Sequence, residues 1–340
     1  MLLTYRRSGF SLVELLVAMT IGILVSSIVI TLYVQIGRNF RFDERYAAMQ
    51  ENGRFSLQML SNDLSMVDFW GRISATDTIS STLTATANSC EDAISMFDPA
   101  SPVLYINYHA SPPILQFTPC TAVTDVQQVN AGMLAIKRVS GIETASVFVD
   151  EADSDGDGNV TEVISTGVSS LTLGSVYLRA NATSGSLINT AGPSAGPPTG
   201  QSDWEYTPVL YFVRAYYDTV GDGVPALCRM SLTSGATTFA LPECIAEGIE
   251  DLHVQFGIDT DADGYANLYL GEPTTAQIAS AVTAQIFVLA RPSSADPFYT
   301  NNKTYQLGDV TRGPFNDGFF RRVYSTTVML RNSVSRILID

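Results

Sequence analysis

One carboxylate of this chain lies in a segment that otherwise carries no charge. The run from Phe10 to Val34 is predominantly apolar, and Glu14 is its only charged side chain. Crossing a hydrocarbon core takes about 20 residues, so this run is long enough to span a membrane. A carboxylate inside a spanning helix is costly and is expected to have a partner or a function. Glu14 is therefore a candidate functional residue.

Peptide-bond cleavage just before this run would supply the missing cation. The run contains no Lys or Arg, but a cut between Gly9 and Phe10 would free an α-amino group four residues before Glu14. Residues four apart are neighbours on a helix. An ordinary secretory signal has its small residue after an apolar region of roughly 7–15 residues, whereas here the small residue comes first. The predicted chemistry is proteolysis after Gly9 and an ion pair between Phe10 and Glu14.

Acidic loops suggest a second chemistry, the binding of Ca²⁺ by oxygen ligands. Segment 151–162 alternates carboxylates with glycines, and Ca²⁺ takes six to eight oxygens. Two EF-hand-like registers are open, one starting at Glu151 and one at Asp153, and only the first closes on an acid, Glu162. The candidate ligands in the two loops are Glu151, Asp153, Asp155, Asp157, Glu162, Asp259, Asp261 and Asp263. The alternative at both loops is a solvated acidic turn.

The sequence shows no pattern typical of a catalytic site. His109 and His253 each lie alone inside a strand-like run, which favours half-buried structural positions. Segment 192–196 has the Gly-x-Ser-x-Gly string of hydrolases, but that elbow needs a strand before it and a helix after it. Both flanks here are loops of Gly, Pro and Ala. We therefore predict a protein without catalytic residues.

The charge balance excludes one class of partner and indicates an orientation. The chain has 340 residues, with 34 acidic against 19 basic side chains and a formal charge of −15. Nucleic-acid binding needs a basic surface, so DNA and RNA are excluded as partners. Arg6 and Arg7 precede the apolar run, and the acidic bulk follows it. The positive-inside tendency then keeps residues 1–9 in the cytoplasm and exports the rest.

A long helix must position Glu14. We predict a leader over residues 1–9 and one helix over residues 10–71, of which 10–34 cross the membrane and 35–71 are amphipathic. Beyond the membrane, apolar residues and one glycine continue at spacings of three and four, typical of a helix face that packs on a domain. These residues are Tyr46, Met49, Gly53, Leu57, Leu60, Leu64 and Val67.

Residues 72–340 are predicted to form a β-rich exported domain, in one body or two lobes. Runs rich in Val, Ile, Tyr, Phe and Thr predict strands. They cover 103–109, 114–118, 133–139, 146–149, 171–179, 209–217, 227–232, 249–258, 286–290 and 323–330, with a short helix around 275–282. Segments 74–89 and 181–202 are predicted to be exposed loops because they have little to bury. The fold class is α+β, one long helix on antiparallel sheet.

The four cysteines all lie in the exported part, where thiols oxidise. Four cysteines allow three connectivities. We favour Cys90 with Cys120 and Cys228 with Cys244, because each pair then closes a loop within a local run of strands. No Cys-x-x-Cys spacing occurs, so zinc is not supported.

The string from Gly9 to Leu15, GFSLVEL, resembles the processing site of the type IV prepilins. Segments 248–259, 321–328 and 64–71 resemble the PilW family of minor pilins. This resemblance implies a pilin-like fold and a non-enzymatic subunit. It further implies cleavage after Gly9 and N-methylation of Phe10 by an inner-membrane prepilin peptidase, and a role for Glu14 in guiding the subunit into the filament.

The resemblance also implies partners and a location. The expected partners are other minor pilins and the major pilin through the N-terminal helix, the inner-membrane pilus assembly machinery, and, as a further candidate, a tip adhesin. Together the minor pilins would prime pilus assembly and cap the tip. The chain would sit in the bacterial inner membrane first and in the surface pilus later. Two alternatives stay open: a pseudopilin of a type II secretion machine, and a membrane-anchored, calcium-dependent binding protein or hydrolase.

Overall fold

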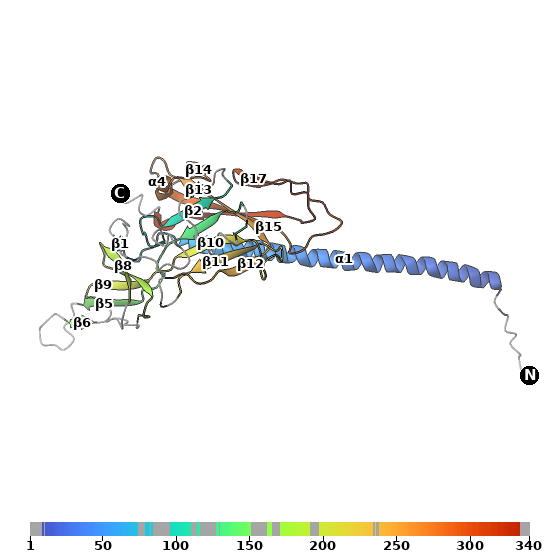
Figure 1. Cartoon of the computed structure of the whole chain (residues 1–340), viewed down its shortest axis with the longest axis horizontal. Helices are drawn as coiled ribbons and strands as arrows, with labels where there is room; N and C mark the ends of the chain where they lie inside the picture. Colours follow the sequence, from blue (N-terminus) through green and yellow to red (C-terminus); the bar gives the residue numbers. More distant parts are fainter. Residues whose placement is uncertain are drawn as a thin grey trace, which may run out of the picture. The chain divides into compact units, whose positions relative to one another are not determined.

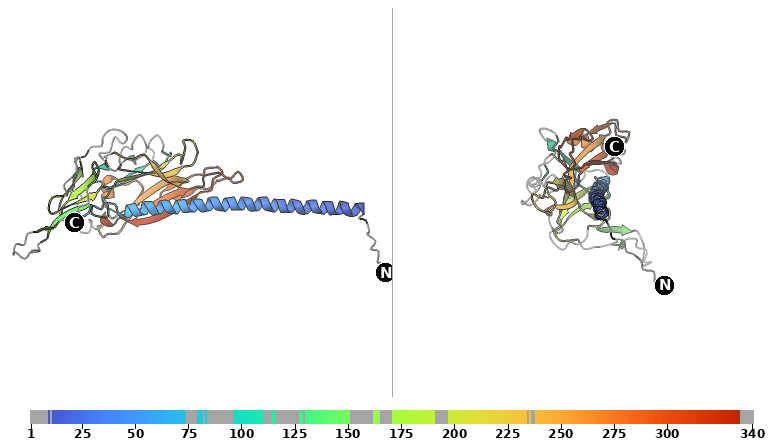
Figure 2. Two further views of the ribbon diagram at one scale, coloured as in Figure 1. Left: turned by 90° about the horizontal axis from the view of Figure 1, so that it is seen from below. Right: turned by 90° about the vertical axis from the view of Figure 1, so that its right-hand side faces the viewer.

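The computed structural model describes residues 9, 11–73, 79–81, 83, 96–109, 114–115, 127–128, 130–150, 162–164, 171–190, 197–233, 235 and 238–333. Two compact units divide the chain, residues 1–48 and residues 49–340. Each unit is described by itself. Helix α1 (Leu12–Ser65) contributes to both, and Figures 1 and 2 show the part of it that belongs to the second unit beside the sheets of that unit.

Helix α1 ends at Ser65 and is followed by turns with two residues of positive φ. Residues 66–68 form turns, and Asp68 has φ +62°. Gly71 follows with φ +66°, in the left-handed region that glycine adopts without a steric penalty. A side chain could not be added to Gly71 because its Cβ would lie 2.6 Å from the Trp204 ring. The α-helix thus ends six residues before Gly71.

Three main sheets form the second unit (Figure 1). The first has the order β1-β8-β7-β9-β5-β6, with bounds Ile79–Ser81, Gly185–Asn189, Val176–Ala180, Gln201–Glu205, Ala145–Asp150 and Glu162–Ile164. The second has the order β12-β11-β10-β4-β2-β3, with bounds Glu243–Glu247, Ala226–Ser231, Val209–Arg214, Met133–Ile136, Val103–Asn107 and Ile114–Leu115. Among the strand pairs that the structure describes, β1 with β8 is the single parallel one.

The third sheet has the order β14-β13-β15-β18, with bounds Leu268–Leu270, Ile249–Ile258, Ala281–Ala290 and Arg322–Met329. A short hairpin, β16 (Tyr305–Leu307) with β17 (Val310–Arg312), and the short helix α4 (Thr275–Ala279) accompany it. All ten residues of β13 are buried. The predicted α+β class, with a long helix on antiparallel sheet, is confirmed.

The C-terminal part of α1 packs on the second unit through the predicted helix face. Met49, Gly53, Leu60 and Leu64 are buried, and Val67 is buried just after the helix. A Cβ added to Gly53 would lie 2.5 Å from the ring of Tyr324 on β18, so only glycine allows this approach. The three-and-four spacing of the sequence is therefore the spacing of the contact face.

Two segments predicted to be exposed loops contain strands, so that prediction was wrong. Strand β8 lies within 181–202, and β1 lies within 74–89 and pairs with it. Both bury an apolar residue, Ile79 and Leu187. Gly, Ser and Asn dominate these strands, so their local propensity is poor. Strand pairing stabilises them instead: β8 forms a hairpin with β7, and β1 pairs with β8, which is far away in the sequence.

Candidate functional site

The first residues of α1 hold the Glu14 carboxylate at the helix start. Ser11 precedes the helix, and its backbone N–H donates to Glu14 Oε2 at 2.9 Å. The carbonyl of Ser11 accepts from the N–H of Leu15 at 3.1 Å. A carboxylate at the third helical position that accepts from the preceding N–H is half of a capping box. It also faces the positive end of the helix dipole, so Glu14 favours helix initiation here.

The predicted cleavage position lies directly before this cap. Gly9 is exposed, and a Cβ built on it has no atom within 4 Å. Phe10 lies outside the described residues. Cleavage after Gly9 therefore stays a prediction.

No described residue of its own unit covers the apolar stretch of α1. Its large apolar side chains from Leu12 to Val34 are 46–79% exposed. This stretch is long and apolar enough to cross a membrane. A contiguous apolar surface of this size needs lipid or other helices around it.

Asp63 connects the other end of α1 to the second sheet. Its Oδ2 accepts from the Tyr211 hydroxyl at 2.5 Å, and its Oδ1 lies 2.9 Å from Arg138 Nη2. Burial, together with the Asp63 charge, raises the pKa of Tyr211, so the tyrosine stays a neutral donor. Upstream, the Asn52 amide donates to the Glu247 carbonyl on β12 at 3.1 Å. Sequence reasoning missed this anchor because an Asp on a helix surface looks solvated.

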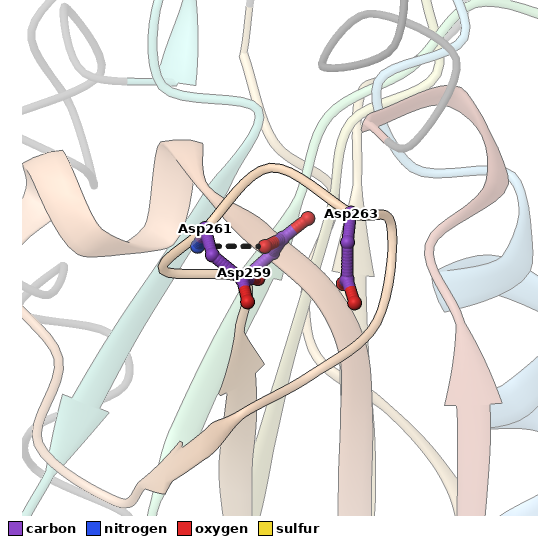
Figure 3. Close-up of side chains that lie close together, drawn as sticks. All are labelled: Asp259, Asp261 and Asp263. Atoms are coloured by element: carbon purple, nitrogen blue, oxygen red, sulfur yellow. Dashed lines mark hydrogen bonds between the residues drawn. The ribbon is translucent and has the colours of Figure 1, made fainter.

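The second acidic loop brings its three carboxylates together (Figure 3). Ligand oxygens of Asp259, Asp261 and Asp263 lie within 4.8 Å of one another. Asp259 is buried, and its carboxylate accepts from the backbone N–H groups of Asp261, Ala262 and Gly264 at 3.2, 2.7 and 2.7 Å. These bonds fold the loop without any ion. Asp261 and Asp263 are exposed, so they are the side chains free to approach a cation.

The first acidic loop lies almost wholly outside the described residues. Glu151, Asp153, Asp155 and Asp157 are not described, and only the backbone of Glu162 is placed, in β6. Calcium binding stays a prediction for both loops, and the donor chemistry of carboxylates fits Ca²⁺ at the second.

The two histidines have structural roles in a buried polar cluster. His253 is fully buried, with Nε2 at 2.7 Å from Asp309 Oδ1 and Nδ1 at 3.0 Å from the Tyr105 hydroxyl. The hydroxyl oxygen of Tyr105 also accepts from the Val254 N–H at 3.2 Å. These contacts suit an imidazole whose Nε2 donates to Asp309 and whose Nδ1 accepts from the Tyr105 hydroxyl. Tyr105 is 1% exposed, so the tyrosine end of this Asp–His–Tyr chain is buried.

The same cluster fixes the β16–β17 hairpin onto β13. Asp309 lies in the turn of the hairpin, and Arg312 on β17 has its Nε 2.8 Å from Asp251 Oδ2. His109 Nε2 lies 3.2 Å from the other oxygen of Asp251. A buried carboxylate that is paired with an arginine tolerates desolvation better than an isolated one. The histidines therefore contribute to the fold of the third sheet.

A cluster of charged side chains joins the two ends of segment 291–321, the segment that contains this hairpin. Arg321 contacts Glu250 through Nε and Nη2 at 2.5 and 2.9 Å, and Asp317 through Nη1 and Nη2 at 2.7 Å each. Arg291 Nε lies 3.4 Å from Glu250 Oε1. The hydrogen bonds from Arg321 lower the pKa of Asp317. Glu250 and Arg321 stand in the segments that resemble PilW, but their pairing across 71 residues could not be seen in the sequence.

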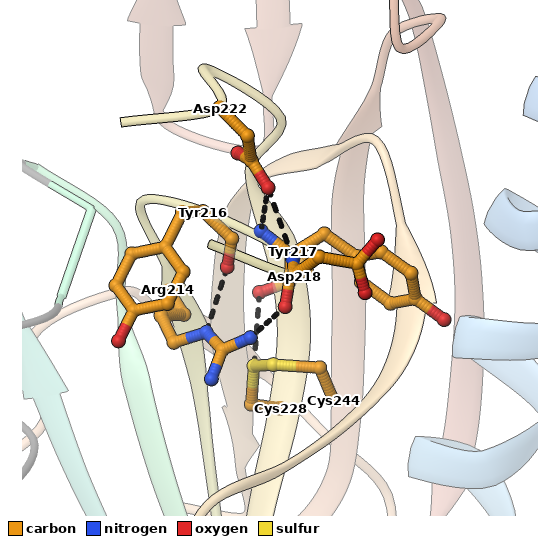
Figure 4. Close-up of a disulfide and its surroundings, with 8 residues drawn as sticks. Arg214, Tyr216, Tyr217, Asp218, Asp222, Cys228 and Cys244 are labelled. Atoms are coloured by element: carbon orange, nitrogen blue, oxygen red, sulfur yellow. Dashed lines mark hydrogen bonds between the residues drawn. A yellow bond between two sulfur atoms is a disulfide. The ribbon is translucent and has the colours of Figure 1, made fainter. Parts of the chain in front are cut away.

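The predicted disulfide between Cys228 and Cys244 is confirmed (Figure 4). It joins β11 to the edge strand β12, at positions that face each other in the register. Nearby, the Arg214 side chain donates to the Tyr216 carbonyl at 2.7 Å within the hairpin loop after β10. Cys90 and Cys120 lie outside the described residues, so their pairing stays a prediction.

Comparison with known families matches both ends of the chain. The prokaryotic N-terminal methylation motif matches residues 4–30, which contain Gly9, Phe10 and Glu14. A family described as Type IV Pilus-assembly protein W, PilW, matches residues 210–332, which contain the third sheet and the cluster of Glu250, Arg291, Asp317 and Arg321. No curated protein and no solved structure matches the chain significantly. Residues 210–332 are therefore similar to the PilW family of type IV pilus assembly proteins, and they stand on one polypeptide with a prepilin-type N-terminal motif.

Proposed function

We propose that this protein is a minor pilin that joins other minor pilins in a complex that primes pilus assembly and sits at the filament tip. The observation that carries the proposal is the combination of a prepilin-type helix start at Gly9–Glu14 with a PilW-type domain. Similarity to this family supports processing by a peptidase and contact with the pilus machinery. The match also favours a pilus over the type II secretion alternative.

The charge at Glu14 supports a mechanism for incorporation. In the full chain, Glu14 accepts from the Ser11 N–H, so one of its oxygens is already engaged. Cleavage after Gly9 adds a positive amine at Phe10, one turn away. A paired carboxylate costs less in an apolar environment than a lone one. The mature N-terminus can then pass from lipid into a bundle of similar helices, with Glu14 neutralised by an amine.

The size of the domain supports a position at the tip. Residues 49–340 form one compact unit, and about 290 residues have a radius of gyration of roughly 19 Å, against about 13 Å for 100 residues. A repeating filament places neighbours above and below each subunit. A large domain fits best where no neighbour lies above it, which is the end of the filament.

The test replaces Glu14 in cells that lack the native copy. Glu14→Gln should still insert, because removing a charge favours membrane insertion, but surface pili should be lost. Glu51→Gln is the matched control, since Glu51 is an exposed glutamate of the same helix outside the apolar run. Counting surface pili by electron microscopy decides the outcome. A Glu14→Gln strain with wild-type pilus numbers would refute the assembly role.

The tip position needs a separate measurement. Antibodies against the second unit, carrying gold, should label filament ends. Labelling along the whole shaft would contradict a tip role while leaving the assembly role intact.

A further inference from the structure

Three arginines line one side of α1 just beyond its apolar stretch. Arg38, Arg41 and Arg45 are spaced three and four residues apart, and at 3.6 residues per turn they fall within an arc of about 60°. We call these three residues the basic stripe. Arg38 and Arg41 are exposed, and Arg45 is partly exposed. All three belong to the first unit.

The acidic residues of this turn lie outside the arc of the basic stripe. By the same helical geometry, Asp43 and Glu44 point about 170° and 90° from its centre. Both are exposed. The helix therefore presents its positive charge on one side, with Glu44 at the edge of that side, three residues from Arg41.

The depth of the basic stripe corresponds to a phosphate layer. The middle of the Leu12–Val34 stretch is Ile23, and a rise of 1.5 Å per residue puts Arg38 about 22 Å beyond it along the helix. The hydrocarbon core ends about 15 Å from its centre, and the headgroup region about 20–22 Å. Long side chains on a helix lean back toward its N-terminus, so Arg38 and Arg41 both reach the headgroups.

The position of these arginines on the exported side of the apolar run is unusual. Within 15 residues of the apolar run, the exported side carries the three arginines of the basic stripe, against Arg6 and Arg7 on the cytoplasmic side. Positive side chains on the exported side oppose the positive-inside tendency. The prepilin motif, rather than the arginine count, therefore sets the orientation, and the basic stripe is retained against that tendency.

We propose that the basic stripe binds the phosphate groups of anionic lipids in the outer leaflet of the inner membrane while the subunit awaits assembly. The planar guanidinium group suits phosphate because it offers two parallel N–H donors. The remainder of the chain is acidic and is repelled by an anionic surface, so the contact is confined to this turn of α1. The inference rests on the proposed function, because it needs the membrane-inserted stage.

The experiment uses the full chain in vesicles of phosphatidylcholine and phosphatidylglycerol at 3:1, with one lipid or the other carrying brominated acyl chains. Val34→Trp supplies the reporter, since Val34 is 46% exposed and lies one turn before Arg38 on the same side of the helix. Trp70 and Trp204 are buried in the second unit. Their signal is subtracted with the chain that lacks Trp at position 34.

Brominated phosphatidylglycerol should quench the reporter about threefold more per mole than brominated phosphatidylcholine, from the attraction of several arginines to an anionic surface. Arg38→Gln/Arg41→Gln/Arg45→Gln should make the two lipids equal. The matched Arg→Lys triple variant, and Asp43→Asn/Glu44→Gln, should keep a preference for phosphatidylglycerol.

Equal quenching by the two lipids with the basic stripe intact, or an unchanged preference in the Gln triple variant, would overturn the proposal. In either case, quenching by brominated phosphatidylcholine shows that the helix is inserted, so the proposed pilin role stands. A reporter that neither lipid quenches would show a helix outside the bilayer and would overturn both proposals together.

Discussion

Two stretches of helix α1 differ in how their apolar side chains are shielded from water. From Leu12 to Val34, the large apolar side chains are all at least 46% exposed. From Met49 to Leu64, the buried positions recur every three or four residues and the remaining positions are polar or partly exposed. The composition of the first stretch determines its surroundings, because an apolar surface on every side needs lipid or other helices. In the second stretch the spacing of the apolar residues determines the surroundings, because a helix with a single apolar side packs that side on a domain.

Substitutions in the two stretches should also differ in their effect on stability. The domain-facing stretch is held by named contacts of Asn52, Gly53 and Asp63. Among the described residues of its own unit, the membrane stretch makes hydrogen bonds local to the helix, such as Ser11 to Glu14. Equivalent substitutions in the two stretches should therefore have unequal effects on unfolding of the second unit.

Loss of the Asp63 anchor should have the largest effect on stability. Asp63→Ala leaves the Tyr211 hydroxyl and Arg138 without their carboxylate. Because these groups are only partly exposed, we expect the unfolding free energy to fall by about 3 kcal/mol. Thermal unfolding of the full chain in detergent measures it. Asp43→Ala, at an exposed position of the same helix, is the control and should change little; similar losses from both variants would contradict the comparison.

Calcium should act on the domain and not on the membrane stretch. An ion that binds only the folded loops adds about 2.7 kcal/mol at a hundredfold excess over its dissociation constant. The unfolding temperature of the second unit should therefore be higher in Ca²⁺ than in chelator. Asp261→Asn/Asp263→Asn should shrink the difference without unfolding the loop, because Asp259 still accepts from the N–H groups of Ala262 and Gly264. An Asn at position 263 also keeps a side-chain oxygen that can accept from the Tyr265 N–H.

The first acidic loop is tested in parallel with Asp155→Ala. Coincident melting curves with and without Ca²⁺, together with no bound metal by elemental analysis, would identify both loops as solvated turns.

Two glycines of α1 give a matched pair of substitutions. Gly53→Ala should lower the unfolding free energy by about 2 kcal/mol, because its Cβ would meet the Tyr324 ring at 2.5 Å. Gly37→Ala has no atom within 4 Å of its Cβ, so helix propensity alone should stabilise by up to about 1 kcal/mol. Opposite signs in thermal unfolding are expected. Equal effects would show that the buried face of α1 does not pack as described.

A buried lysine beside the end of α1 should make domain stability depend on pH. Lys137 is fully buried, and its Nζ donates to the Asp98 carbonyl at 2.7 Å. Burial lowers its pKa to about 7, against about 10.4 in an unfolded chain. Between these values the unfolded state binds more protons. Stability should therefore rise with pH, by about 1 kcal/mol per pH unit above pH 7.

Lys137→Met removes this titration. The unfolding temperature of Lys137→Met minus that of the wild type should decrease as the pH rises from 6 to 9, because only the wild type gains stability with pH. A difference that stays constant over this range would show that Lys137 does not titrate there.

Local sequence patterns predicted the elements whose structure depends mainly on their own residues. The helix face from Met49 to Val67 and the full extent of β13 follow from periodicity and from a run of strand-forming residues. Strand β9 could not be predicted, because its buried Asp203 is stabilised by pairing with Arg179 on β7. Strand β1 could not be predicted either, because it pairs with β8, which is far away in the sequence. Hairpin β16–β17 likewise depends on contacts with Asp251 and His253, more than 50 residues earlier.

The candidate sites follow the same division. Gly9, Phe10 and Glu14 are close in sequence, and their spacing alone carries the prediction. The Cys228–Cys244 disulfide joins consecutive strands and could also be predicted. Asp63 and the Glu250–Arg321 pair could not, because their partners lie 148 and 71 residues away. A charged residue on a helix or strand surface gives no sign of such a partner.

The central claim is that the N-terminus is a processing site and not a plain membrane anchor. Intact-mass analysis of the protein recovered from cells tests it most directly. The mature chain should begin at Phe10, with a methyl group on its amine, and should lack Arg6 and Arg7, so that the side-chain charge becomes (19 − 2) − 34 = −17. A chain that still begins at Met1, or one that begins after Val34, would contradict the account.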